Sequence, residues 1–387
     1  MLSRKLLAAA VAASLVVPGV AAAEYDSIQV GNLSIGGALR ANYRIGDYDG
    51  TRSDFDKGGD FFLDTARINL DYASGPWLGK LEYRWYSGYN MLHTGWVGYD
   101  FENESQVQVG VNRVPFGPGA YGVSQSWFFD QHYYVGLSDD MDLGVKYTLP
   151  AGDWTWDFGY YLQDEGDWSG DTRDSARYSY DVVNESGSGY EERNQVNLRG
   201  IYSLPNVAVD TDIGFSAQYG ELDSKGPQGD GDHYALSLHM VNKWDNWTLA
   251  SQLTGYTFDV SADQPLGTDE LVQFGAFDFP NTVAAEGYIP AVSLSYFLET
   301  PTIPWLDFVI PYAEYSAILK RESDFNDSNL AVLGAAWGRG NWYIYSEFAF
   351  SDGNEFVGGD TAFGDRLGAN EDDDWLTRFN INLGYYF

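Results

Sequence analysis

The sequence predicts an all-β protein, a transmembrane up-and-down antiparallel β-barrel of about 16 strands. Three observations lead to this fold class: an N-terminal export signal, a two-residue alternation of apolar and polar side chains, and connections that are alternately short and long. The composition agrees, because 29 Tyr, 13 Trp and 44 Gly among 387 residues are typical of a chain rich in strands and turns.

The charge balance and the lack of cysteine exclude several classes of protein. The chain has 22 basic and 56 acidic residues, a net charge of -34 at pH 7. Nucleic-acid binding needs a basic surface, so this balance argues against it. Disulfides and thiolate metal sites are excluded because there is no cysteine. Intrinsic disorder is excluded because 44% of the residues are hydrophobic.

The first 23 residues are predicted to be a signal peptide. Arg4 and Lys5 form a positive region, residues 6–17 are almost all apolar or small, and Ala21 to Ala23 supply a small-residue cleavage site. The apolar run is too short to span a bilayer comfortably, which argues against a transmembrane anchor. We expect cleavage near Ala23, which leaves residues 24–387 as one exported barrel domain.

The C-terminal strand shows the alternation most clearly. From Trp375 to Phe387 the odd positions are almost all apolar, with aromatic residues at both ends, whereas the even positions are mostly polar. Successive side chains of a strand face opposite sides, so this pattern indicates a lipid-facing side between aromatic girdles and a wet interior. Beyond Ala23 no stretch of 18 apolar residues exists, which excludes a helical membrane protein.

Similar alternation recurs along the whole chain and gives the remaining strands. In order, the predicted strands are 33–45, 66–72, 77–85, 91–102, 105–113, 141–149, 154–160, 196–202, 206–219, 233–244, 247–259, 287–299, 305–319, 328–337, 342–350 and 375–387. Every second connection is a tight turn, and the others are mostly long and acidic. This order predicts an up-and-down barrel with both termini on the periplasmic side and an aqueous lumen.

Taken together, the signal peptide, the strand number, the long third loop and the terminal Phe387 resemble a Gram-negative outer-membrane porin. The string Gly110 to Gly117, followed by Asp140-x-Asp142-x-Gly144, is similar to the phosphate-selective porin O/P group. That group holds phosphate with basic residues on the pore loop, and this chain departs from the pattern because residues 114–145 contain no Lys or Arg.

This resemblance implies a third loop folded into the lumen, association as a trimer, and contact with outer-membrane lipid and lipopolysaccharide. It also implies that the barrel-assembly machinery reads the C-terminal strand, with Phe387 as the main assembly signal and Tyr385 and Leu383 adding to it.

Inward-phased basic residues form the first candidate functional group. Four of the strands that carry them are contiguous around a closed barrel, so much of the positive charge gathers on one wall. Charged walls are one way in which pores select ions. Alternatively, these bases only pair with Asp64, Asp71 or Glu82. The predicted pore-lining residues are Arg40, Arg44, Arg67, Lys80, Arg84, Lys146, Arg199 and Arg378.

The third loop, residues 113–140, is the second candidate. Acids on this loop that face the basic wall would create a transverse field across the pore. Its aromatic side chains provide either a stacking track for sugars or, as we favour, an anchor against the barrel wall. The predicted constriction residues are Arg113, Asp130, Asp139, Asp140, Trp127, Phe128 and Tyr133, with Phe129 and Tyr134 in the same aromatic group.

An acidic outer rim is the third candidate. Residues 54–60 superficially resemble a calcium loop, but Gly58 and Thr65 stand where two of the ligands belong. We therefore expect a solvated surface and no metal or cofactor. The rim acids are Asp47, Asp49, Asp54, Asp56, Asp60, Asp164, Glu165, Asp167, Glu371, Asp372, Asp373 and Asp374.

These features predict a porin that lets ions and small hydrophilic solutes diffuse passively through a water-filled channel. The alternatives are a solute-specific channel, for a sugar or an anion such as phosphate, and an outer-membrane barrel enzyme. The enzyme is less favoured, because the four histidines, His93, His132, His233 and His239, belong to neither a Gly-x-Ser-x-Gly nor a His-Glu-x-x-His motif.

Overall fold

The computed structural model describes residues 27–47, 58–185, 187–205, 208–358 and 365–387. The predicted signal peptide with its cleavage site at Ala23 lies outside these residues, as do the rim residues Asp49, Asp54 and Asp56.

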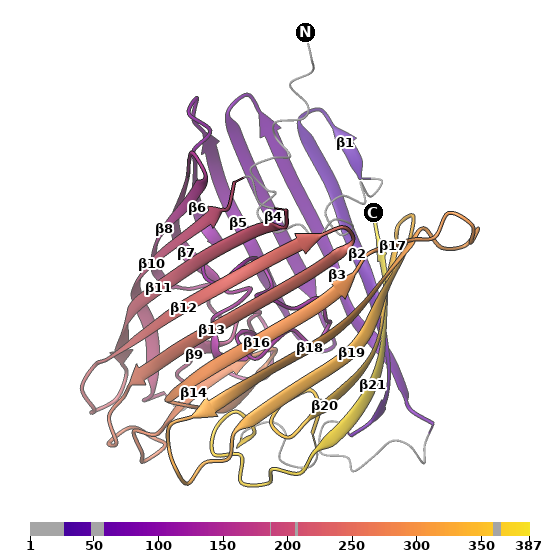
Figure 1. Cartoon of the computed structure of the whole chain (residues 1–387). Coiled ribbons are helices and arrows are strands. Elements are labelled where there is room, and N and C mark those ends of the chain that lie inside the picture. The colour runs from indigo at the N-terminus through magenta and orange to yellow at the C-terminus, as the bar shows by residue number, and fades with distance from the viewer. Residues whose placement is uncertain (1–26, 48–57, 186, 206–207, 359–364) are drawn as a thin grey trace.

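Sixteen antiparallel strands form the barrel (Figure 1). They agree with the predicted strands in number and order. Their bounds are β2 (Leu33–Gly46), β3 (Asp60–Ser74), β4 (Trp77–Trp85), β5 (Asn90–Asp100), β6 (Gln106–Arg113), β7 (Met141–Ala151), β8 (Trp154–Asp164), β10 (Tyr190–Ser203), β11 (Asp210–Ser224), β12 (Gly231–Trp244), β13 (Trp247–Asp259), β16 (Glu286–Tyr296), β18 (Phe308–Lys320), β19 (Ser328–Arg339), β20 (Trp342–Ser351) and β21 (Leu376–Tyr386).

Pairing between the first and last of these strands closes the sheet. Ala38 of β2 lies opposite Tyr386 of β21, and the pairing continues to Gly46 opposite Arg378. Each other strand pairs with its neighbours in chain order, so the predicted up-and-down topology is confirmed. Among the described residues, no helix is both long and apolar enough to cross a membrane.

The outer surface of the barrel is apolar, as the alternation predicts. On β12, Leu236 and Leu238 are 66% and 67% exposed, whereas Ala235, Ser237 and His239 between and beside them are buried. Such exposed apolar bands are typical of strands that face lipid. Aromatic pairs lie at the ends joined by short turns, for example Trp77 with Tyr99 and Trp342 with Tyr385.

The outer ends of several strands extend further than the alternation indicates. β3 begins at Asp60 rather than near residue 66, and β10 begins at Tyr190 rather than near residue 196. In both regions the pairing shifts, between Arg40 and Ala41 of β2 and between Arg193 and Val196 of β10. A β-bulge reverses the phase of the alternation, so a two-residue pattern stops being visible at that point.

A second, smaller sheet lies among the outer loops and has no signal in the sequence pattern. It contains β9 (Asp181–Val182), β14 (Leu271–Ala276) and β15 (Phe279–Ala284). Figure 1 places the labelled β9 and β14 toward the end of the barrel where the long loops lie. The remaining elements are short, namely β1 (Ile28–Val30), β17 (Leu298–Glu299) and the 3₁₀-helix η2 (Tyr133–Val135).

Buried apolar side chains of the loops pack into one cluster with inward residues of the wall. The loops are named L3 (114–140, after β6), L4 (165–189, after β8), L6 (260–285, after β13) and L8 (352–375, after β20). Tyr133 of L3, Tyr180 and Val182 of L4, Phe274 of L6 and Val357 of L8 are all at most 1% exposed. Burial on this scale fixes the outer loops against one another.

Candidate channel constriction

The strands that carry the predicted basic wall are neighbours. β21, β2, β3 and β4 pair in that order. Arg67 and Arg84 lie directly opposite each other, a like-charge pair that destabilises a sheet unless an acid compensates it. Glu82 provides that acid, since its Oε1 accepts from Arg84 at 2.6 Å and from Arg67 at 3.2 Å. Two guanidinium groups share one carboxylate, which leaves this part of the wall positive.

Arg40 and Lys80 are also paired, each with an acid of the same wall. Arg40 contacts Asp64 at 2.7 Å, and Lys80 lies 3.6 Å from Asp71. These ion pairs are the ones that the sequence analysis gave as an alternative to a pore-lining role, namely pairs of the bases with Asp64, Asp71 and Glu82. The side chains of Arg40 and Arg67 nevertheless keep 18% of their surface exposed. These two bases are therefore both paired and accessible from inside the barrel.

Arg44 lies toward the outer end of β2. It contacts Asp60 at 3.2 Å, and 16% of its side chain is exposed. Its guanidinium also lies 4.7 Å from the centre of the Phe62 ring. This base is placed at the rim side of the wall rather than beside L3.

Two predicted wall bases, Lys146 and Arg199, bind the beginning of L3. The Lys146 ammonium donates to the Arg113 carbonyl at 2.8 Å. The Arg199 guanidinium donates to the Gly117 carbonyl at 3.4 Å and binds Asp157 at 2.7 Å. The sequence analysis predicted that both residues line the pore, and the structure shows that they hold the start of the loop.

Arg378 lies beneath L3 and is fully buried. Its guanidinium lies 4.9 Å from the ring of Trp127 and 5.2 Å from that of Phe128. It also donates to the Phe356 carbonyl of L8 at 2.9 Å. A cation stacked between aromatic rings in this way ties L3 and L8 to the last strand.

Acidic residues of β18 and β20, strands that follow the basic wall on the side of β21 away from β2, fix the middle of L3, and the sequence analysis did not single them out. Glu314 of β18 accepts hydrogen bonds from the Ser124 hydroxyl at 2.6 Å and from the Gln125 amide at 2.5 Å. Glu347 of β20 accepts from the Trp127 amide at 2.8 Å. Both acids face inward by strand phase, but their partners belong to a loop 190 and 220 residues away in the sequence.

The aromatic residues of L3 are packed rather than open. The rings of Phe129 and Tyr133 stack with centroids 4.2 Å apart, and Tyr133 meets Tyr180 of L4 at 5.2 Å. Phe128, Tyr133 and Tyr134 are at most 1% exposed, so they have no free face on which a sugar would stack. This packing is what the anchoring interpretation requires.

Two of the three predicted acids of L3, Asp130 and Asp139, bind partners outside the basic wall. Asp130 binds the His132 ring at 2.8 Å. Asp139 binds the Arg113 guanidinium at 2.6 Å and accepts from the Tyr178 hydroxyl at 2.6 Å. Asp140 is 5% exposed and lies among other buried acids. The field across the lumen therefore comes mainly from the basic wall itself.

One edge of L3 remains accessible, and it lies close to the basic wall. The Arg113 side chain is 32% exposed, and its guanidinium lies 5.5 Å from the ring of Tyr121. Tyr121, which the sequence analysis did not identify, is 50% exposed. Arg67 and Arg84 lie within electrostatic range of its hydroxyl. We define the candidate constriction as Arg40, Arg67, Arg113 and Tyr121.

The assembly residues lie where the barrel closes. The Phe387 carbonyl accepts from the Gly37 amide at 2.7 Å, and the Phe387 amide donates back to Gly37 at 3.0 Å. Leu383 lies opposite Ala41 in the same seam, and Tyr385 lies opposite Leu39. The C-terminal residue thus continues the pairing that joins the last strand to the first.

No protein-family model matches the chain, and no curated protein matches it by sequence. Solved outer-membrane barrels do share its fold. In-vitro folded OmpT, an outer membrane protein of Vibrio cholerae in its trimer form, is 16% identical over 93% of this chain and 100% of that chain, with a TM-score of 0.58. The outer membrane channel DcaP of Acinetobacter baumannii is 10% identical over 93% and 99%, also at 0.58.

The anion-selective porin from Comamonas acidovorans is 12% identical over 92% of this chain and 99% of that chain, with a TM-score of 0.57. At these identities the likeness establishes the barrel fold alone. Phosphate-selective porins of the O/P group are not among these three structures, so that finer resemblance stays a prediction.

Proposed function

We propose that the protein is an outer-membrane channel through which ions and small hydrophilic solutes diffuse passively. The observation that carries this proposal is the set of charged side chains inside the closed sheet that keep access to solvent. Arg40 and Arg67 are 18% exposed there, and Arg113 is 32% exposed. Charged groups hold this exposure only beside water, so an aqueous path next to the wall is the simplest arrangement.

Location in the outer membrane rests on the exposed apolar band and on the export signal. We infer that the signal peptide is removed near Ala23 and that the barrel-assembly machinery recognises Phe387. The exposed apolar band of the barrel would contact membrane lipid, and the acidic rim would contact lipopolysaccharide. Trimer formation is part of the proposal, supported by the trimer form of the similarly folded Vibrio cholerae OmpT.

Two opposing charge effects set the proposed ion preference. The chain carries a net charge of -34, and its acidic rim concentrates cations at the mouth. The constriction attracts anions, because Arg67 and Arg84 share a single carboxylate. The Debye length is about 8 Å at physiological salt, so the rim charges have little effect on ions at the distant constriction. They still attract cations to the wide channel mouth that they surround. We propose modest cation preference, strongest at low salt.

A solute-specific anion channel is the second candidate function. The excess positive charge of the group formed by Arg67, Glu82 and Arg84 favours it, as do the exposed Arg113 and the short distance between that residue and the wall. In such a channel a specific anion would block the current of other ions.

Catalysis is the third candidate, and one arrangement bears on it. Asp130 binds the His132 ring at 2.8 Å, and the opposite ring nitrogen lies 2.8 Å from the Thr254 hydroxyl. This order of groups is that of an acid–base–nucleophile triad. All three residues are at most 3% exposed, however, so no substrate reaches the hydroxyl. We propose that the group fixes L3 to β13 and that the protein is not an enzyme.

Liposome swelling tests the proposed function. Liposomes that contain the purified, folded protein should swell in neutral sugars at rates that fall smoothly with sugar size. Protein-free liposomes serve as the control. Swelling in one sugar only would favour the solute-specific candidate, and swelling no faster than the control would contradict a diffusion channel.

A further inference from the structure

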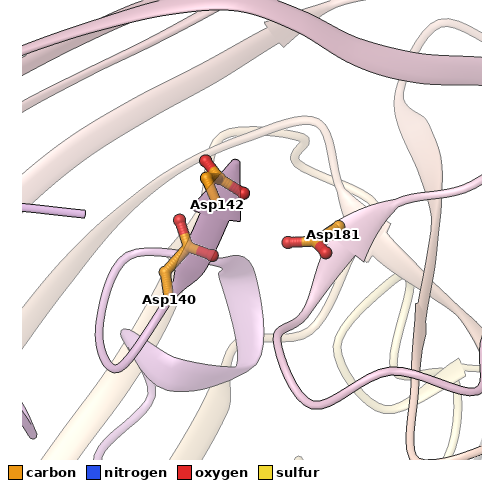
Figure 2. Close-up of side chains that lie close together, drawn as sticks. All are labelled: Asp140, Asp142 and Asp181. Atoms are coloured by element: carbon orange, nitrogen blue, oxygen red, sulfur yellow. The ribbon is translucent and has the colours of Figure 1, made fainter. Parts of the chain in front are cut away.

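Buried carboxylates that the channel does not use gather where L3 enters the barrel wall. Asp140 is the last residue of L3, Asp142 follows it in β7, and Asp181 belongs to β9 in L4. Asp140 and Asp142 are two residues apart and therefore project from the same face of the chain. Figure 2 shows all three side chains directed toward one common space. One oxygen from each lies within 4.8 Å of the others.

These carboxylates are removed from water. Asp140, Asp142 and Asp181 are 5%, 2% and 1% exposed. Glu165 and Glu192, at 6% and 7%, lie close enough to act on them electrostatically. Packing this many like charges in a dry site is unfavourable unless something positive offsets them.

Basic residues supply little of that compensation. Arg177 binds Asp181 at 3.1 Å and Asp164 at 2.5 Å. Within the described parts of the chain, no ion pair joins Asp140, Asp142 or Glu192 to a base.

Unsatisfied oxygens provide the second, independent observation. The Asp142 carboxylate accepts from the Gln195 amide at 3.2 Å through Oδ2, whereas its Oδ1 has no hydrogen-bond partner. Oδ1 of Asp140 and Oε2 of Glu165 also have none. Glu165 also lies close enough to Asp181 to act on it electrostatically. Buried oxygens of this kind normally have partners, and a bound cation would both occupy these oxygens and offset the clustered negative charge.

The ligand type indicates the kind of ion. Carboxylate oxygens are ligands for hard cations, and the cluster contains neither His nor Cys. Ca²⁺ accepts six to eight oxygens in flexible geometry, whereas Mg²⁺ requires a near-ideal octahedron. We propose that Asp140, Asp142 and Asp181 bind a calcium ion, with the buried carboxylates of Glu165 and Glu192 adding to the negative charge around it.

This ion would join three outer loops. Asp140 ends L3, and Asp181 belongs to L4. Asp181 also pairs with Gly275 of β14 in L6. An ion held by Asp140 and Asp181 therefore fixes the end of the constriction loop to the small sheet that covers it. The calcium site is structural and does not depend on which solute passes through the channel.

Terbium luminescence and thermal stability of the full-length folded protein test this proposal. Tb³⁺ substitutes for Ca²⁺ and is sensitised by nearby tyrosines, here Tyr161, which lies within electrostatic range of Asp140 and Asp142. We expect a saturable signal that calcium displaces. In wild type, EGTA should lower the midpoint temperature at which the folded band on unboiled gels is lost. A hundredfold excess of calcium over its Kd shifts the folding equilibrium about 100-fold.

Variants separate the calcium site from a cluster that is simply protonated. Asp181→Asn lies outside the barrel strands and should weaken Tb³⁺ binding by about tenfold or more and abolish the effect of EGTA. Asp142→Asn should behave in the same way. The control, Asp263→Asn with Asp269→Asn, removes two exposed acids of L6 and should bind Tb³⁺ like wild type.

Two results would overturn the proposal. One is an Asp181→Asn protein, verified as folded, whose Tb³⁺ signal equals that of wild type. The other is a midpoint temperature of this variant that lies above that of wild type whether or not EGTA is present. Such a result would mean that the substitution relieved charge repulsion without removing an ion, so that no cation was bound.

Discussion

Replacing Glu314 with alanine should release the middle of L3 from the barrel wall. The Glu314 carboxylate accepts three hydrogen bonds, from Ser124 at 2.6 Å, from the Gln125 amide at 2.5 Å and from Ser293 at 2.8 Å. The alanine leaves three donors without this acceptor, at a cost of about 1–3 kcal/mol for each donor that stays buried. Only Ser124 and Gln125 belong to L3, and water enters the space that is freed, so we use the lower end for two donors, ~2 kcal/mol in total.

That loss shifts the equilibrium between the docked and the released loop about 30-fold. In planar bilayers we expect the variant to flicker between conductance levels and to have a higher mean conductance than wild type. Glu314→Gln keeps one oxygen acceptor and should have a smaller effect. The control is Glu286→Ala, which removes an acid that is 41% exposed and contacts only the barrel rim. A steady wild-type conductance in the folded Glu314→Ala protein would refute the assignment of Glu314 as an anchor of L3.

Three further predictions concern assembly, selectivity and pH. Deletion of Phe387 removes its paired hydrogen bonds to Gly37 and should reduce the heat-modifiable folded band, with precursor left in the periplasm; an unchanged outer-membrane yield would contradict this. Replacing Arg40, Arg44 and Arg84 together with serine should raise cation selectivity in reversal-potential measurements, because the wall loses its positive excess; an unchanged potential would mean that these side chains do not act on the pore. Burial raises the pKa of Glu355 in L8 from 4.5 to about 7. The protonated acid therefore stabilises the folded loops by up to about 3 kcal/mol below pH 4.5, and this contribution is lost as the pH rises through about 7. After correction for the base-catalysed intrinsic exchange rates, the protection of L8 amides should accordingly be lower at pH 8 than at pH 5.5, and Glu355→Gln should remove the difference. Equal protection in wild type at both pH values would refute the assignment.

The barrel was predictable because lipid and lumen impose a strict period of two on every long strand. Leu236 and Leu238 show the pattern directly, since both point toward lipid and their neighbours point inward. The pattern fails only where a bulge shifts the phase, as beside Arg40 in β2. Both the number of strands and their order followed from this periodicity and from the turns.

The interior was less predictable because phase gives the direction of a side chain but not its partner. Arg378 faces inward as expected, yet it lies under Trp127 of L3. The calcium site illustrates the same limit. Asp140 and Asp142 are adjacent in sequence, but Asp181 reaches them only through the fold of L4, and β9 has too few residues to show any period.

Reversal potentials of purified protein in planar bilayers under a salt gradient test the central claim most directly. The account predicts discrete conductance steps, with a reversal potential that favours cations and approaches zero as the salt concentration rises. A bilayer that shows no conductance steps, although the reconstituted protein is verified as folded, would contradict a diffusion channel.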